Sequence, residues 1–213
     1  MEAYDTVKIT GSAVVEVKKS RFLAELRHIT SVDEAESFLY EIKKEHYDAR
    51  HHCSAYILRG QEGAPDITRY SDDGEPQGTA GRPMLEVLTR EELKDVMIVV
   101  TRYFGGTLLG TGGLVRAYTD ACKEAVSACE KVRMVLMQQF SVVFDYTHTG
   151  VLDRYILDKG ITRINALYTD KTEYILAIPE GSYDPAVSDI VDMTASSAVI
   201  TGLDLCYSPV VVP

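Results

Sequence analysis

The segment Arg102–Tyr118, RYFGGTLLGTGGLVRAY, decides the fold of the first part of the chain. An apolar run at 96–100 precedes it and predicts a strand, and helical spacing of apolar residues begins near Leu114. Glycine tolerates positive φ and close approach of other backbone, so clustered glycines predict a tight loop between this strand and this helix. Five glycines fall within nine positions: Gly105, Gly106, Gly110, Gly112 and Gly113.

This glycine-rich loop opens onto a helix N-terminus, where free N–H groups and the positive end of the helix dipole form a general site for anions. Arg102 and Arg116 flank the loop and would add positive charge to such a site. The loop is not a Walker A motif, because Thr111 and Gly112 follow Gly110 in place of Lys and Ser or Thr. The predicted anion site comprises the two arginines and the five glycines. The alternative is a turn that only lets the helix pack on the strand.

A cation in the first turn of a helix, as expected for Arg116, opposes the helix dipole and needs a negative partner. That partner is either a bound anion or a carboxylate of the chain itself. The segment Ser71–Pro76, SDDGEP, supplies three carboxylates in a predicted turn. We expect this turn either to share a cleft with the glycine loop or only to shape the chain locally. Metal binding through its oxygens is a third interpretation, although the spacing matches no EF-hand loop.

The tripeptide His51-His52-Cys53 leads into the strand predicted at 53–58 and suggests zinc or nucleophile chemistry. On a strand, His51 and Cys53 share one face and His52 lies on the other. One His and one Cys make half of a zinc site, and no second pair at ligand spacing exists. The sequence therefore predicts no metal, no cofactor and no catalytic residue. The polar residues expected in the cleft are Arg21, His52, Asp72, Asp73 and Glu75.

The chain of 213 residues carries a formal charge of −10. Up to Leu136 it has 18 basic and 22 acidic residues, and after it 4 basic and 10 acidic, so both parts are acidic. Non-specific nucleic-acid binding depends on basic surface, which leaves only a local basic patch in the first part. Four dispersed cysteines and an N-terminus without signal-peptide character predict a cytoplasmic protein with reduced thiols. No apolar run approaches the length of a membrane span.

Two domains are expected, at residues 1–132 and 138–208. In the first, a capping box at Ser31–Glu34 predicts a helix, and residues 59–83 form a long loop. A second capping box at Thr89–Glu92 predicts a short helix. Strands are expected at 7–10, 12–17, 21–29, 53–58 and 96–102.

In the second domain the expected order of elements is βαββαβ, the ferredoxin-like motif. The strands are predicted at 140–146, 161–168, 172–178 and 197–207, and the helices at 147–159 and 185–194.

The motifs of the first domain resemble those of the IMPACT (YigZ-like) family. The resemblance rests on the glycine-rich segment 102–118 and covers roughly residues 1–130. It is also carried by Lys19–Phe22 (KSRF), His51–Tyr56 (HHCSAY), Ser71–Pro76 (SDDGEP) and Gly78–Gly81 (GTAG). The C-terminal part is similar to the small second domain of bacterial members, which itself is similar to the last domain of elongation factor G.

The resemblance implies an α/β (α+β) fold, with a first domain like domain 2 of ribosomal protein S5. It also implies a regulatory role linked to translation, with ribosome, RNA or a translation-associated protein as partner and without established catalysis. Eukaryotic relatives carry an additional N-terminal domain and compete for a ribosome-associated activator of a kinase, a relationship that does not transfer directly to this chain. The alternative is a small-molecule or phosphoryl-handling enzyme that uses the glycine-rich loop as an anion site.

Overall fold

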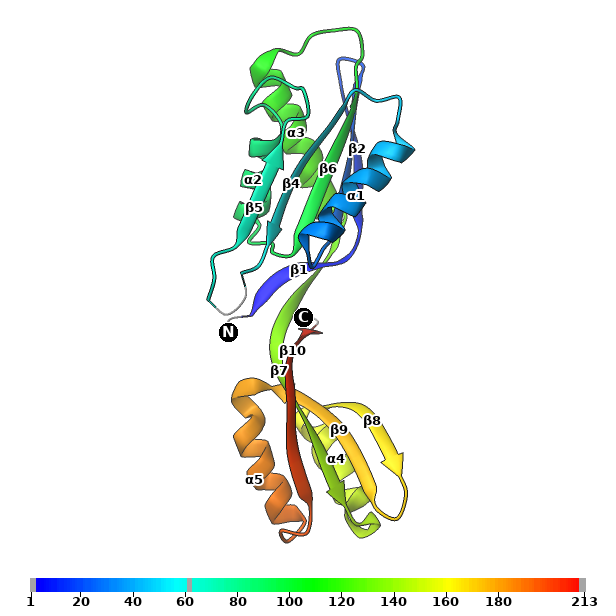
Figure 1. Ribbon diagram of the computed structural model, residues 1–213, viewed down its shortest axis with the longest axis vertical. Helices are drawn as coiled ribbons and strands as arrows, with labels where there is room; N and C mark the ends of the chain where they lie inside the picture. Colours follow the sequence, from blue (N-terminus) through cyan, green and yellow to red (C-terminus); the bar gives the residue numbers. More distant parts are fainter. Residues whose placement is uncertain (1–2, 61–62, 211–213) are drawn as a thin grey trace. The chain divides into compact units, whose positions relative to one another are not determined.

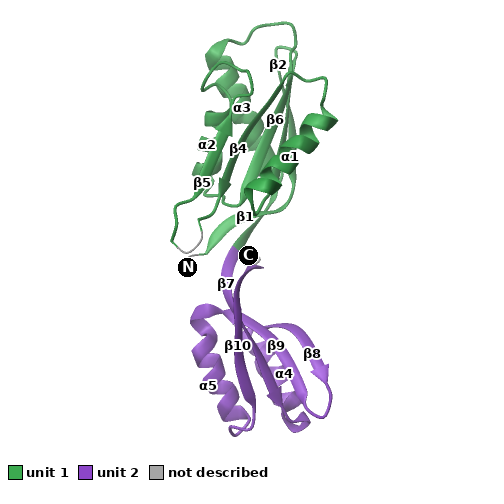
Figure 2. Cartoon of the chain, in the orientation of Figure 1, with its two compact units in different colours: residues 1, 3–133, 211–213 green, residues 2, 134–210 purple. Residues whose placement is uncertain are grey.

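The computed structural model describes residues 3–60 and 63–210. They form two compact units, Ala3–Arg133 and Met134–Val210 (Figure 2). The expected loop at 59–83 includes Gln61 and Glu62, which lie outside the described residues. Within the described ranges, no helix is long and apolar enough to cross a membrane.

Unit 1 is built on a five-stranded antiparallel sheet with helices on both faces (Figure 1). The helix α1 (Val32–Glu45) packs on one face, and α2 (Gly81–Arg90) and α3 (Gly110–Ser127) pack on the other. The strand β1 (Tyr4–Ile9) lies outside this sheet; it pairs with β7 (Glu130–Phe144), and its Asp5 forms an isolated bridge to Leu93. The order of the sheet is β2 (Gly11–Val17), β3 (Ser20–His28), β6 (Val96–Tyr103), β4 (His51–Leu58), β5 (Ile67–Ser71).

The central strands β4 and β6 are apolar on both faces because helices cover both sides of the sheet. In β6, Ile98 and Val100 contact the side of α2 and α3, and Met97 and Val99 contact the side of α1. The predicted capping box of α1 is confirmed, because Ser31 Oγ accepts a hydrogen bond from the Glu34 amide at 3.2 Å. The glycine loop therefore joins two elements that are both packed into the core of unit 1, β6 and α3.

Unit 2 has the βαββαβ order of a ferredoxin-like domain, as predicted. Its strands lie in the order β10, β7, β9, β8, and α4 (Thr149–Lys159) and α5 (Tyr183–Met193) supply the helices. The core includes Phe140, Phe144 and Tyr174, and α4 ends at Gly160 with φ +64°. The strands are β7 (Glu130–Phe144), β8 (Thr162–Tyr168), β9 (Thr172–Pro179) and β10 (Val199–Val210), and two short 3-10 turns are Tyr146–His148 and Glu180–Ser182.

Several predicted boundaries are wrong. The supposed capping box at Thr89–Glu92 begins no helix, because it coincides with the end of α2, whose N-terminus is capped by a distant residue. The expected loop at 59–83 contains β5 and the start of α2. The strand β7 begins at Glu130 rather than Phe140, and α3 begins at Gly110 rather than Leu114, because the glycines continue the helix.

Candidate functional site

The turn after β5 is organised by Asp72, which acts as a remote cap for α2. Its Oδ1 accepts hydrogen bonds from the amides of Ala80 at 3.0 Å and Gly81 at 2.9 Å, and its Oδ2 accepts one from Gly78 at 2.8 Å. Gly81 is the first residue of α2, Ala80 is its N-cap and Gly78 lies just before it, so the carboxylate sits at the positive end of the helix, where it is favourable. The Asp72 side chain is therefore committed to holding the turn closed.

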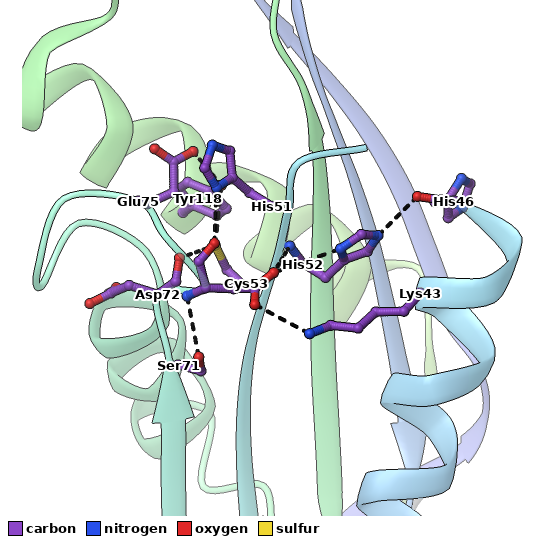
Figure 3. A network of polar contacts seen from close by, with 10 residues as sticks. Lys43, His46, His51, His52, Cys53, Ser71, Asp72, Glu75 and Tyr118 are labelled. Carbon is purple, nitrogen blue, oxygen red and sulfur yellow. Dashed lines mark hydrogen bonds and ion pairs between the residues drawn. The ribbon is translucent and has the colours of Figure 1, made fainter. Parts of the chain in front are cut away.

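Asp73 ties the same turn to β4 and α1. Its Oδ2 accepts a hydrogen bond from the His52 amide at 2.7 Å, and its Oδ1 lies 3.2 Å from Lys43 Nζ. The ring of His51 meets the Asp73 carbonyl through Nδ1 at 2.9 Å, and the His52 ring meets the His46 carbonyl through Nε2 at 3.1 Å. Figure 3 shows how these contacts bring the end of α1, the start of β4 and the turn together.

Glu75 and Arg102 form a buried ion pair, with their side chains 3% and 7% exposed. Arg102 Nη1 donates to Glu75 Oε1 at 2.6 Å, and the Tyr118 hydroxyl donates to the same oxygen at 2.8 Å. The internal salt bridge weighed from sequence is therefore present for Arg102. Its Nε is also buried, and it has no hydrogen-bond partner among residues 3–60 and 63–210.

Cys53 and Tyr118 are buried beside this ion pair and have little chemical reactivity. Cys53 Sγ lies 3.0 Å from the Asp72 carbonyl and 3.3 Å from the Tyr118 hydroxyl (Figure 3). Burial raises the pKa of the Cys53 thiol to about 12, and burial also raises the pKa of Tyr118. A thiol that stays protonated is a poor nucleophile, so the structure argues against the nucleophile interpretation of Cys53.

The glycines of the loop play different structural parts. Gly105 allows close backbone packing, because a Cβ there would lie 2.0 Å from the Lys19 carbonyl carbon. Gly106 and Gly110 have φ of +83° and +72°, which favours glycine. A Cβ at Gly112 would meet nothing within 4 Å, so that position is open.

The N-terminus of α3 has no cap. No side chain among residues 3–60 and 63–210 accepts a hydrogen bond there, and the first turn contains no acidic residue. The amides of Gly110, Thr111 and Gly112 are the free donors of this turn. Hence the structure retains the positive helix end that the sequence predicted.

A pocket of about 420 Å³ opens beside this helix end. One part of its wall is charged or polar, from Arg102, Glu75 and the first residues of α3. The rest is apolar, and two side chains at its edge, Phe104 and Leu108, are 55% and 84% exposed. The lining residues are Arg50, His51, Glu75, Pro76, Arg102, Phe104, Leu108, Leu109, Gly110, Thr111 and Leu114.

The structure brings together part of the predicted site. Arg102, Glu75 and Gly110 line the pocket, whereas Asp72, Asp73 and His52 lie behind it and hold the turn. Gly105, Gly106, Gly112 and Gly113 belong to the loop and the first turn of α3 but do not line the pocket.

The two remaining arginines of the prediction lie elsewhere. Arg116 is exposed on α3, does not line the pocket, and makes no ion pair with any residue that the structure describes. Arg21 is also exposed, with its Nε 3.6 Å from Glu16 Oε1. Of the three arginines proposed from sequence, only Arg102 reaches the pocket.

Eight lining residues were not among the predicted site residues: Arg50, His51, Pro76, Phe104, Leu108, Leu109, Thr111 and Leu114. His51 was considered only for metal or nucleophile chemistry, and Phe104 was not placed in the site. An exposed Leu108 between glycines was a signal, since an apolar residue in a polar loop has no core to enter. The sequence around Arg50 gave no signal. Arg50 lies in the loop between α1 and β4, and only the fold places that loop next to the pocket.

A separate group, Glu25, Glu45 and His46, offers three possible metal ligands within 4.8 Å of one another. It includes none of the residues predicted for the cleft. Exposed acidic groups of this kind are common without an ion. Proximity of these three side chains is therefore not by itself a metal site.

Comparison with known proteins identifies both units. The model of the Impact N-terminal domain matches residues 18–126, and that of a domain of unknown function matches residues 142–197. The IMPACT family member YigZ of Escherichia coli is 42% identical over 207 residues, covering 96% of this chain and 100% of that protein. YvyE of Bacillus subtilis, also an IMPACT family member, is 35% identical over 97% of this chain and 94% of that protein. A crystal structure described as that of a hypothetical protein is 32% identical, with a TM-score of 0.62, and covers 96% of this chain and 98% of that one. This chain belongs to the IMPACT family.

Proposed function

We propose that this protein is a cytoplasmic regulatory protein linked to translation, which acts by binding a ribosome, an RNA or a ribosome-associated protein rather than by catalysis. The link to translation comes from the motif resemblance, and the family on which that resemblance rests is the one to which the chain belongs. The pocket of unit 1 is the recognition site in this proposal.

The observation that carries a binding role is the exposure of Phe104 and Leu108 at the edge of the pocket. Large apolar side chains that a fold leaves in solvent beside a hollow are typical of contact surfaces. Aromatic residues in particular contribute strongly to recognition. The polar pair Glu75 and Arg102 at the base of the pocket would orient whatever binds.

The polar groups around the pocket favour binding over phosphoryl transfer. Both Asp72 oxygens accept backbone hydrogen bonds, and Glu75 is held by Arg102 and Tyr118. A phosphoryl-handling enzyme needs a residue to orient the nucleophile and usually a carboxylate that holds magnesium. The anion-binding part of the alternative remains possible at the open end of α3. The catalytic part lacks a free carboxylate, because Glu75 is the one carboxylate among the described lining residues and it is already held.

Ribosome co-sedimentation tests this function, with Phe104→Ala and Leu108→Ala as variants. Both side chains are exposed, so we expect little change in stability and loss of co-sedimentation. Leu157→Ala is the matched control, since Leu157 is 76% exposed on α4 of unit 2. If the native protein fails to sediment at low salt, or if all three variants sediment like it, the proposal is wrong.

The salt dependence of binding identifies the kind of partner. Contacts to phosphates release counterions, so binding to RNA falls steeply as salt rises. Binding to a protein through Phe104 and Leu108 would change little over the same range. Arg102→Ala is unsuitable for this experiment, because it would leave Glu75 buried without its partner.

A further inference from the structure

The pocket of unit 1 has two chemically distinct ends. The polar end consists of Arg102, Arg50 and the free amides at the start of α3. The apolar end consists of Phe104, Leu108, Leu109, Leu114 and Pro76. A ligand that matches both ends carries an anionic group on an apolar or aromatic body.

Arg102 has unused hydrogen-bonding capacity at the polar end. Only its Nη1 donates to Glu75, and the buried Nε lacks a partner in the described part of the chain. An unsatisfied buried donor is costly, and guanidinium groups bind phosphate or carboxylate oxygens through paired donors. The fold therefore keeps a nearly buried cation partly unpaired beside the pocket.

The charges that face the pocket favour an anion. Two arginines, Arg50 and Arg102, and the positive end of α3 are opposed by one carboxylate, Glu75. Arg50 is exposed and makes no ion pair with the residues described here. The excess positive charge is local, because the chain as a whole carries −10.

The start of α3 has room for a tetrahedral group. A Cβ at Gly110 or Gly112 would meet no atom within 4 Å beyond the neighbouring backbone, so no side chain crowds the helix surface at these two residues. Backbone amides at a glycine-lined helix end suit the oxygens of a phosphate.

The apolar end suits a flat ring. Phe104 is 55% exposed, and the Arg102 guanidinium lies 5.6 Å from its ring centroid, so a cation and an aromatic face lie side by side. Nucleobases stack on such surfaces. The volume of about 420 Å³ falls within the range of small-molecule sites.

We propose that this pocket binds a nucleoside monophosphate, with the phosphate at the start of α3 beside Arg102 and Arg50 and the base against Phe104. The inference rests on the proposal that the pocket is the recognition site of a regulator, and it names the chemistry recognised there. The nucleotide is either free or the phosphorylated end of an RNA strand. The acidic surface of the chain disfavours contacts along a longer strand, so recognition centres on one nucleotide.

Titration calorimetry with adenosine 5′-monophosphate tests the phosphate, with adenosine as the comparison ligand. We expect adenosine to bind at least about tenfold more weakly, because it lacks the charged group. The matched variants are Thr111→Asp and Thr111→Asn, which differ only in charge at the end of α3. The Asp variant should weaken nucleotide binding about tenfold relative to the Asn variant, by repulsion in the first turn.

Phe104→Leu tests the base, because leucine keeps an apolar side chain but removes the ring. We expect about fivefold weaker binding of the nucleotide, as stacking contributes substantially per base. Equal affinity for nucleotide and adenosine, equal affinity of the two Thr111 variants, or no heat with millimolar nucleotide would overturn the proposal. Octanoate that competes as well as the nucleotide would overturn it too, since any apolar anion would then suffice.

An oligoribonucleotide with and without a 5′-phosphate distinguishes the two sources. Tighter binding of the phosphorylated strand than of the mononucleotide assigns the RNA end, and binding of the mononucleotide alone assigns the free ligand. These titrations use purified protein without ribosomes. Their failure would leave co-sedimentation and its dependence on Phe104 and Leu108 untouched, so it is distinguishable from failure of the proposed function.

Discussion

The N-termini of α2 and α3 lie in the same unit and have the same electrostatic need, but the protein treats them differently. At α2, the chain supplies its own anion, because Asp72 accepts hydrogen bonds from Gly78, Ala80 and Gly81. At α3, the first turn is glycine-rich, lacks an acid and opens beside the pocket. The contrast shows that the N-terminus of α2 is satisfied within the chain, whereas the N-terminus of α3 remains available to a ligand from outside.

The largest expected effect concerns the ion pair beside the open end. Arg102→Ala should lower the free energy of unfolding by about 3–5 kcal/mol, because it leaves the buried carboxylate of Glu75 without its cation. Urea denaturation followed by circular dichroism measures the loss. The double variant Arg102→Met with Glu75→Leu should recover most of the stability but not ligand binding. A loss below about 1 kcal/mol for Arg102→Ala would show that solvent reaches Glu75 freely.

The next largest loss of stability is expected at the N-terminus of α2, which Asp72 caps. Asp72→Ala removes an acceptor for three amides, so it should destabilise unit 1 by about 2–3 kcal/mol in the same denaturation experiment. Asp72→Asn is the control, since its amide keeps one acceptor oxygen and should lose about half as much. If both variants are as stable as the native protein, the α2 end is closed by some other means and the contrast between the helices disappears.

Within the glycine loop, Gly105→Ala should cost about 1–3 kcal/mol. Its Cβ would lie 2.0–2.3 Å from backbone atoms of Lys19 and Ser20, which cannot move without shifting the turn between β2 and β3. Gly112→Ala is the matched comparison, because its Cβ would meet nothing and a helical alanine is favourable. A lower melting temperature for Gly112→Ala than for Gly105→Ala would contradict this division of the loop into packing and open positions.

The smallest effect is expected from a substitution that makes the N-terminus of α3 resemble that of α2. Thr111→Asp places a carboxylate in the uncapped first turn and should raise the stability of unit 1 by about 0.3–1 kcal/mol relative to Thr111→Asn. The gain should fade as salt is added, which a denaturation series at increasing ionic strength measures. A destabilised Asp variant would mean that the end of α3 already has a negative partner.

Much of the fold could be predicted from local patterns. Alternating apolar residues located β2 and β3, the capping box at Ser31 located α1, and the βαββαβ order identified unit 2. The error at α2 has a physical cause, because its cap is supplied by Asp72, eight and nine residues before the amides that it holds. A cap at that distance has no sequence signature of the usual spacing.

The site was harder to predict than the fold. The glycine loop and Arg102 could be found because they are adjacent in sequence, and the carboxylate turn because it is compact. Arg50 and His51 reach the pocket only through the packing of β4 against β6, where His51 pairs with Arg102 in register. Arg116 was assigned to the site from its closeness in sequence, and helix geometry directs it elsewhere.

Cys53 and Cys122 lie fully buried in the core of unit 1, where burial raises the pKa of each to about 12. Alkylating reagents attack the thiolate, so these two thiols should stay unlabelled while the core is intact. Cys129 and Cys206 are partly exposed and should label first. The rate at which these two buried thiols are alkylated therefore reports how often unit 1 opens. Followed by mass spectrometry, this slow phase measures the kinetic stability of unit 1 without any mutation.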